Sequence, residues 1–173
     1  MYETLKRKVK TEIKERLEND SYQIKEETDD KGNVQIWLKL FNKQDILHIA
    51  QIIKDFGGRC VIISAYKSKD DDYVLVYHLD IDGMLINVEV IATDKKIDSI
   101  TPILNSANWT EREFKEMYGI EPISHPNPAR LFLDESIAEG ILAEYMPLSQ
   151  AMNGAATCCM WEKIESERNQ DEC

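Results

Sequence analysis

The stretch Tyr73–Ala92 reads YVLVYHLDIDGMLINVEVIA and predicts a β-hairpin. Two runs rich in β-branched, aliphatic and aromatic residues flank Asp82-Gly83, a pair that tolerates the positive φ angles of a type I′ turn. Along the second run, apolar residues alternate with Asn87 and Glu89. The apolar residues of that face are Met84, Ile86, Val88 and Val90. The alternation predicts two antiparallel strands with one face buried in a core.

The sequence before the hairpin contains two further predicted strands. Val34–Phe41 alternates in the same way, and Val61–Tyr66 is a short apolar run. The polar stretch Glu26–Asn33 contains Gly and Asp residues typical of a turn, and it is predicted to be one.

Two helices are predicted beside these strands. Residues 4–18 carry apolar residues at four-residue steps, which is typical of an amphipathic helix. A second helix is expected to begin after the N-cap Asn42 and to end at Gly57-Gly58. Strands and helices in this order predict an α+β fold, with an antiparallel or mixed sheet and helices packed on one side of it.

A third helix has the most distinct local signals. Thr110–Glu113 reads TERE, a capping box in which Thr110 is the expected N-cap and Glu113 reaches back to it. Trp109 and Phe114 are placed as a hydrophobic staple around this start, and Gly119 is the expected stop. The predicted buried stripe consists of Phe114, Met117 and Tyr118.

A stiff, proline-rich segment follows this helix. Glu121–Pro128 contains three prolines, which fix φ and remove backbone donors, so we expect an extended segment that stays out of the central sheet. We call Ser124–Leu131 the strap. A rigid segment next to a well-capped helix favours a surface that binds another protein.

The predicted domain organisation is one α+β domain over residues 1–133 and a C-terminal extension over residues 134–173. Within the extension, Met152–Arg168 is a candidate helix and Asn169–Cys173 a frayed acidic end.

Charge and composition disfavour several classes of function. The 173 residues include 21 basic and 32 acidic side chains, for a net charge of −11. This balance disfavours nucleic-acid binding and direct attachment to anionic lipid. No run approaches the roughly 20 apolar residues of a membrane span, and the first residues do not resemble a secretory signal, so a cytoplasmic location is expected.

The candidates for metal or catalytic chemistry are few. The four cysteines include no C-x-x-C pair, and the adjacent Cys158 and Cys159 are interpreted as a packing seam, with reactive thiols as the minority alternative. Glu111, Glu113 and Glu116 with His125 are weighed as a metal site, but capping and solvation are preferred. A stand-alone enzyme using His125 with Glu113 or Glu116 remains an alternative.

A resemblance is carried by ANWTEREFKEMYGI at Ala107–Ile120, by Ser124-His125-Pro126 and by Arg130-Leu131. Asp98–Ile103 and Tyr77-His78-Leu79 extend it upstream. These motifs are similar to those of the 30 kDa subunit of respiratory complex I (NADH:quinone oxidoreductase), and of its counterparts in membrane-bound energy-converting [NiFe] hydrogenases. The sequence departs from the family pattern at Ser124, Asn127 and Ala129, and again after Leu133, at Asp134–Ile137.

The resemblance implies a non-catalytic hydrophilic-arm subunit without a cofactor of its own. Such a subunit packs chiefly on the homologue of the [NiFe]-hydrogenase large subunit, together with cluster-bearing subunits, and supports electron transfer to quinone or protons. It lies at the cytoplasmic face of the membrane and reaches the membrane only through the complex. A free-standing adaptor that has kept the fold is the remaining alternative.

The resemblance also assigns roles to residues. Arg112, His125, Pro126 and Arg130 are expected to contact the partner. The structural signature comprises Trp109, Thr110, Glu111, Glu113, Phe114, Glu116 and Gly119. For Arg112, an ion pair with Glu116 one turn further on is the alternative.

Overall fold

The computed structural model describes residues 2–18, 20–28, 34–68, 72–133, 139–140 and 142, which belong to a compact unit spanning Met1–Ala143. Its elements, in chain order, are α1 (Tyr2–Arg16), β1 (Tyr22–Thr28), β2 (Val34–Leu40), the 3-10 turn η1 (Lys43–Asp45), α2 (Ile46–Asp55), β3 (Arg59–Lys67), β4 (Tyr73–Ile81), β5 (Met84–Ala92), β6 (Lys96–Asp98), the 3-10 turn η2 (Asn105–Ala107), α3 (Asn108–Tyr118) and β7 (Glu121–Ile123). The predicted helix Met152–Arg168 and the Cys158-Cys159 pair lie outside the described residues.

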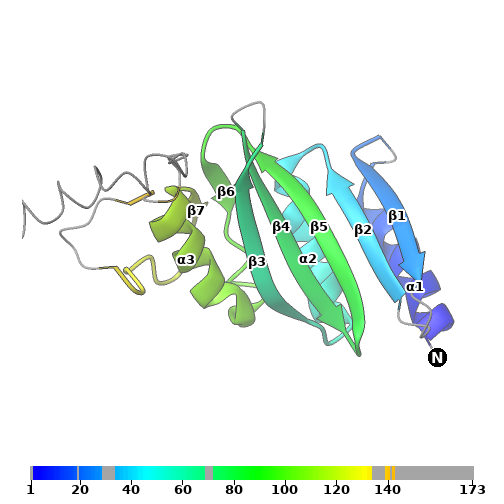
Figure 1. Ribbon diagram of the computed structural model, residues 1–173. Coiled ribbons are helices and arrows are strands. Elements are labelled where there is room, and N and C mark those ends of the chain that lie inside the picture. The colour runs from blue at the N-terminus through cyan, green and yellow to red at the C-terminus, as the bar shows by residue number, and fades with distance from the viewer. Residues whose placement is uncertain are drawn as a thin grey trace, which may run out of the picture. The chain divides into compact units, whose positions relative to one another are not determined.

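Within the described residues, the main sheet has five strands in the order β1-β2-β5-β4-β3. The β2–β5 pairing is parallel and the other pairings are antiparallel, so the sheet is mixed. Helices α1 and α2 cover one face of this sheet, and none of the described helices covers the opposite face (Figure 1). The predicted α+β class is therefore confirmed.

The hairpin that decides the fold forms as predicted. Register pairs run from Tyr73↔Ala92 to Ile81↔Met84, and Asp82 and Gly83 have φ angles of 49° and 85°. Both signs fit a type I′ turn. Asp80 Oδ1 also accepts a 3.0 Å hydrogen bond from the backbone N–H of Gly83. The face of β5 that was predicted to be buried is completely so.

Strand β1 was not predicted from the sequence. The stretch Glu26–Asn33 was interpreted as a turn, but Glu26–Thr28 belongs to β1, where Glu26 pairs with Ile36. This strand lies at an edge of the sheet and most of its side chains are exposed. A solvated edge strand needs few apolar residues, so its sequence resembles that of a loop.

Helix α3 begins earlier than its sequence predicts. The turn η2 leads directly into it, and the N-cap position is Ala107, which already has helical φ and ψ angles of −79° and −12°. Thr110 is therefore inside the helix, where its Oγ1 donates to Ala107 O at 3.0 Å. The predicted capping box is wrong because an N-cap residue needs extended dihedrals. Gly119 does end the helix, with a φ of 67°.

The proline-rich segment stays out of the main sheet, as predicted. Its first residues form β7, which pairs in parallel with β6, so that Pro122 lies opposite Ile97. This two-stranded sheet and α3 lie on the β3 side of the main sheet (Figure 1). The β6–β7 pairing places the end of α3 and the start of the strap side by side.

Candidate functional site

Helix α3 buries a carboxylate in its first turn. Glu111 has no solvent exposure, and its Oε1 accepts a 2.7 Å hydrogen bond from the backbone N–H of Ile100. Its Oε2 accepts from the hydroxyls of Ser99 and Thr101, the latter at 2.7 Å. Donors of this kind replace the water shell that a buried carboxylate loses. The interpretation of Glu111 as a capping or solvated residue is thus wrong, because it joins the preceding loop to α3.

His125 places the start of the strap against this carboxylate. Its imidazole is fully buried, Nδ1 accepts a 3.0 Å hydrogen bond from Asn127 N, and Nε2 lies 3.6 Å from Glu111 Oε2. Because Nδ1 accepts, the neutral ring carries its proton on Nε2, which faces the carboxylate. Among the described residues Nε2 has no hydrogen-bond partner. His125 therefore acts inside the protein, between α3 and the strap.

Arg112 holds the end of the strap from the next helical position. Its Nε donates to Ala129 O at 2.7 Å, and a terminal guanidinium nitrogen donates to Arg130 O at 2.5 Å. The fork of donors thus binds two successive carbonyl groups. The alternative pairing with Glu116 does not occur among the described ion pairs.

Glu116 binds the chain immediately after Arg130. Its carboxylate is 1% exposed and accepts hydrogen bonds from the backbone N–H groups of Leu131, Phe132 and Leu133, those to Phe132 and Leu133 at 3.0 and 3.3 Å. Burial alone would raise the pKa of Glu116, but the three backbone donors together outweigh it and lower the pKa. Helix α3 therefore holds the strap with a carboxylate at each end and an arginine between them.

Three large apolar side chains around α3 are exposed. The exposed fractions are 64% for Trp109, 60% for Phe132 and 55% for Leu142. The prediction that Trp109 is a buried staple is wrong, whereas Phe114 is 2% exposed, as expected. Trp109 lies two residues before Glu111, about 200° away around an α-helix, and so on the face opposite the buried one. A helix that starts at Asn108 puts Trp109 on its exposed face, so the wrong start explains the wrong prediction for Trp109.

The other predicted interface residues lie on the strap itself. Pro126 is exposed and Arg130 is half-buried.

Beyond the strap, Gly140 N donates to Glu116 O at 2.7 Å and Leu142 N to Met117 O at 2.8 Å. This return of the chain caps the last carbonyl groups of α3.

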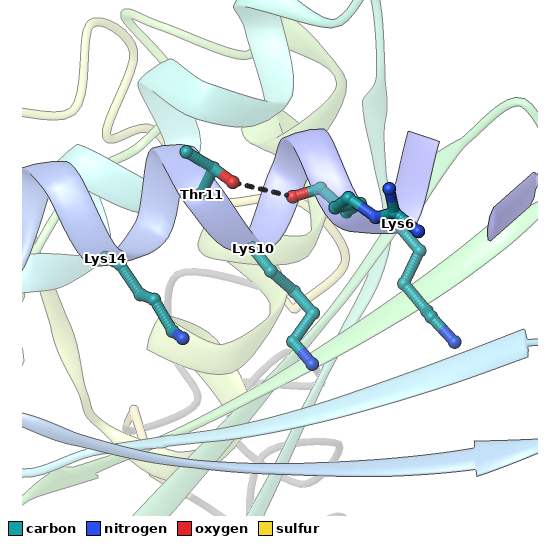
Figure 2. A pocket seen from close by; sticks show the side chains of 5 residues that line it. Lys6, Lys10, Thr11 and Lys14 are labelled. Atoms are coloured by element: carbon teal, nitrogen blue, oxygen red, sulfur yellow. Dashed lines mark hydrogen bonds between the residues drawn. The ribbon is translucent and has the colours of Figure 1, made fainter. Parts of the chain in front are cut away.

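A hollow along α1 is lined by Lys6, Arg7, Lys10, Thr11 and Lys14. Figure 2 shows Lys6, Lys10 and Lys14 extending from the same side of the helix. Lys6 and Lys10 both form ion pairs with Glu26 of β1, with 3.1 Å between Lys6 Nζ and Glu26 Oε2. Hydrogen bonds from Lys10 and Lys6 lower the pKa of Glu26. These cations join α1 to the edge of the sheet.

The described residues offer no metal site and no reactive cysteine. They contain no group of three or more His, Cys, Asp or Glu side chains placed to hold a metal ion. Burial, with the nearby Glu111 charge, raises the pKa of the Cys60 thiol to about 12, so this cysteine is not a reactive thiolate. No helix of the described chain is long and apolar enough to cross a membrane.

A family model described as the 30 Kd subunit of the respiratory-chain NADH dehydrogenase matches residues 40–157. Among curated proteins, the chain is 29% identical over 128 residues to the C-type subunit of NADH-quinone oxidoreductase from Citrifermentans bemidjiense, covering 68% of this chain and 77% of that protein. It is 32% identical over 72 residues to hydrogenase-4 component G of Escherichia coli, covering 39% of this chain and 13% of that protein.

A solved structure has a related fold. The trypsin-resistant fragment (1-134) of Nqo5 aligns with a TM-score of 0.50 at 20% sequence identity, over 73% of this chain and 98% of the fragment. At this identity the likeness concerns the fold alone.

Proposed function

Because the chain belongs to the family of the respiratory-chain NADH dehydrogenase 30 Kd subunit, we propose that it is a non-catalytic hydrophilic-arm subunit of a complex I-like or energy-converting-hydrogenase-like assembly. Its partners would be the other subunits of that complex, chiefly the homologue of the [NiFe]-hydrogenase large subunit and the cluster-bearing subunits. Its contribution would be to hold the electron-transferring subunits in place on the way to quinone or protons. Its location would be the cytoplasmic face of the membrane, which it reaches only through the complex.

The observation that supports this proposal most is the way α3 holds the strap. Buried Glu111 faces His125, Arg112 binds two carbonyl groups, and Glu116 binds three N–H groups, so the segment is fixed before any partner arrives. A surface that is already ordered loses less conformational entropy on binding. This arrangement fits a docking surface better than an active site.

The residues predicted to contact the partner then have two distinct roles. Arg112 and His125 would act indirectly, because their polar atoms bind or face groups of this chain. Pro126 and Arg130 on the strap would contact the partner directly. We add exposed Trp109 and Phe132 as the apolar anchors, since tryptophan and other large side chains dominate the binding energy of many interfaces.

The alternative of a stand-alone enzyme using His125 with a glutamate has less support. The His125 imidazole is fully buried, and Glu116 is occupied by backbone donors. Neither group is presented to a substrate in this arrangement. A free-standing adaptor differs from a member of a larger complex only in its partners, so an experiment must separate these two.

Purification of the tagged full chain from its native host, followed by mass spectrometry, tests the proposal. We expect the large-subunit homologue and cluster-bearing subunits to be recovered with it in comparable amounts. Recovery of the tagged chain without any of these subunits would contradict the proposed function and favour the adaptor.

A further inference from the structure

Three polar side chains form a hydrogen-bonded chain across three adjacent strands. Ser64 Oγ of β3 lies 3.0 Å from His78 Nε2 of β4, and His78 Nδ1 lies 2.7 Å from Asn87 Oδ1 of β5. The neighbours of His78 in β4, Tyr77 and Leu79, are fully buried in the core. Because side chains alternate along a strand, His78 points to the sheet face opposite α1 and α2 (Figure 1).

The order of these groups is that of a nucleophile, a base and a residue that orients the base. Asn87 Oδ1 can only accept, so His78 Nδ1 carries the proton and the lone pair of Nε2 faces the Ser64 hydroxyl. Asn87 is 1% exposed and lies directly opposite His78 in the strand register, which fixes the imidazole on a rigid support. Ser64 itself is exposed.

A groove of about 280 Å³ adjoins this serine. Ser64 lines it together with other residues of β3, with α3 and with Leu142. Its apolar lining residues include Ile62, Phe114, Met117 and Tyr118. Among the described strands, β3 pairs with β4 alone, so the N–H groups on its outer edge have no ladder partner, and that of Cys60 donates to Ser106 Oγ instead.

We propose that Ser64 is a nucleophilic serine that accepts an acyl group from an activated apolar ester. Ser64 Oγ attacks the ester carbonyl carbon while its proton moves to His78 Nε2. The bond from that carbon to the leaving oxygen then breaks, and Nε2 returns the proton to the departing alcohol. The products are an acyl ester of Ser64 and the free alcohol. The proposal is independent of the docking function.

The test uses the full chain with p-nitrophenyl butyrate at neutral pH, and measures p-nitrophenol release together with the acylated residue by peptide mass spectrometry. We expect one acyl group on Ser64. Ser64→Ala should abolish this label, and His78→Gln should slow it by roughly 100-fold, within the usual effect of a general base. Asn87→Leu should slow acylation roughly tenfold or more, because His78 Nδ1 loses the acceptor that keeps the proton on that nitrogen.

Ser21→Ala is the matched control, because the described hydrogen bond of the Ser21 hydroxyl goes to the Glu18 carbonyl and not to a histidine. Its acylation rate should equal that of the parent. Thermal melts show whether each variant is folded, and Ser64→Ala and His78→Gln alter groups outside the apolar core. Acylation of other residues with Ser64 unlabelled, or an unchanged rate in folded His78→Gln, would overturn the proposal.

Discussion

Replacing Glu116 by glutamine should loosen the attachment of the strap to α3. The carboxylate offers two oxygens to the N–H groups of Leu131, Phe132 and Leu133, whereas the amide offers one oxygen and an NH₂ group that repels these donors. A hydrogen bond to a charged group contributes about 1.5–3 kcal/mol. Loss of one such bond, with partial rearrangement of the others, gives an expected loss of about 2 kcal/mol in the free energy of unfolding.

The effect should depend on pH in a defined direction. The pKa of Glu116 lies below its usual value of 4.5, because the backbone donors outweigh burial. The carboxylate therefore stabilises the fold fully above pH 4.5, and this contribution is lost as the pH falls through the lower folded pKa. Once Glu116 is protonated, the parent has a neutral side chain at this position, as the glutamine variant does.

Urea denaturation of the parent and Glu116→Gln at neutral pH and at progressively lower pH measures this difference. We expect a gap of about 2 kcal/mol at neutral pH that narrows in acid. Glu113→Gln, on the same helix and half-buried, is the control and should stay within about 0.5 kcal/mol of the parent. A Glu116→Gln gap that is absent, or that stays constant with pH, would refute the assigned role of the carboxylate.

The other predictions concern the same helix. Trp109→Ala should change the free energy of unfolding by about 0.5 kcal/mol or less, whereas Phe114→Ala should cost about 3–5 kcal/mol, both measured by urea denaturation; equal losses would contradict the exposure of Trp109. Arg112→Lys should raise the rate of amide hydrogen exchange at Leu131 and Phe132, because a lysine cannot bind two carbonyl groups as the guanidinium does. Unchanged exchange in this variant would mean that Arg112 does not hold the strap. Glu111→Ala should destabilise by about 3 kcal/mol in thermal or urea melts, since buried donors lose their acceptor, and a parental melt would rule out that contact.

Local patterns were sufficient to predict the central hairpin and strand β2. The bounds of β4 and β5 follow from alternation and from Asp82-Gly83, and β2 buries every second residue from Val34 to Leu40, as its sequence indicates. Strand β1 could not be predicted in this way. Only Tyr22 and Ile24 of this strand pack against the core, and the rest of its contacts are the pairing with β2 and the ion pairs of Glu26, so its apolar pattern is too short to indicate a strand.

The contacts between α3 and the strap could not be predicted from the sequence. Sequence motifs indicated α3 and the strap, yet charged residues normally indicate solvent, and Glu111 and Glu116 are both buried. Their donors come from loops that are distant in sequence, so no local pattern contains them. Trp109 was misplaced because η2 starts the helical turn before the residues that resemble a capping box.

The most direct test of the docking surface compares two exposed phenylalanines in the assembled complex. Phe132, next to the strap, is 60% exposed, and Phe41, just after β2, is 63% exposed. Each is changed to alanine in the tagged chain, Phe132→Ala also together with Trp109→Ala, and recovery of sibling subunits is measured after purification. We expect recovery to fall roughly tenfold or more for the Trp109 and Phe132 double variant and to stay parental for Phe41→Ala. Parental recovery for the double variant, or an equal loss for Phe41→Ala, would contradict the assignment of α3 and the strap as the docking surface.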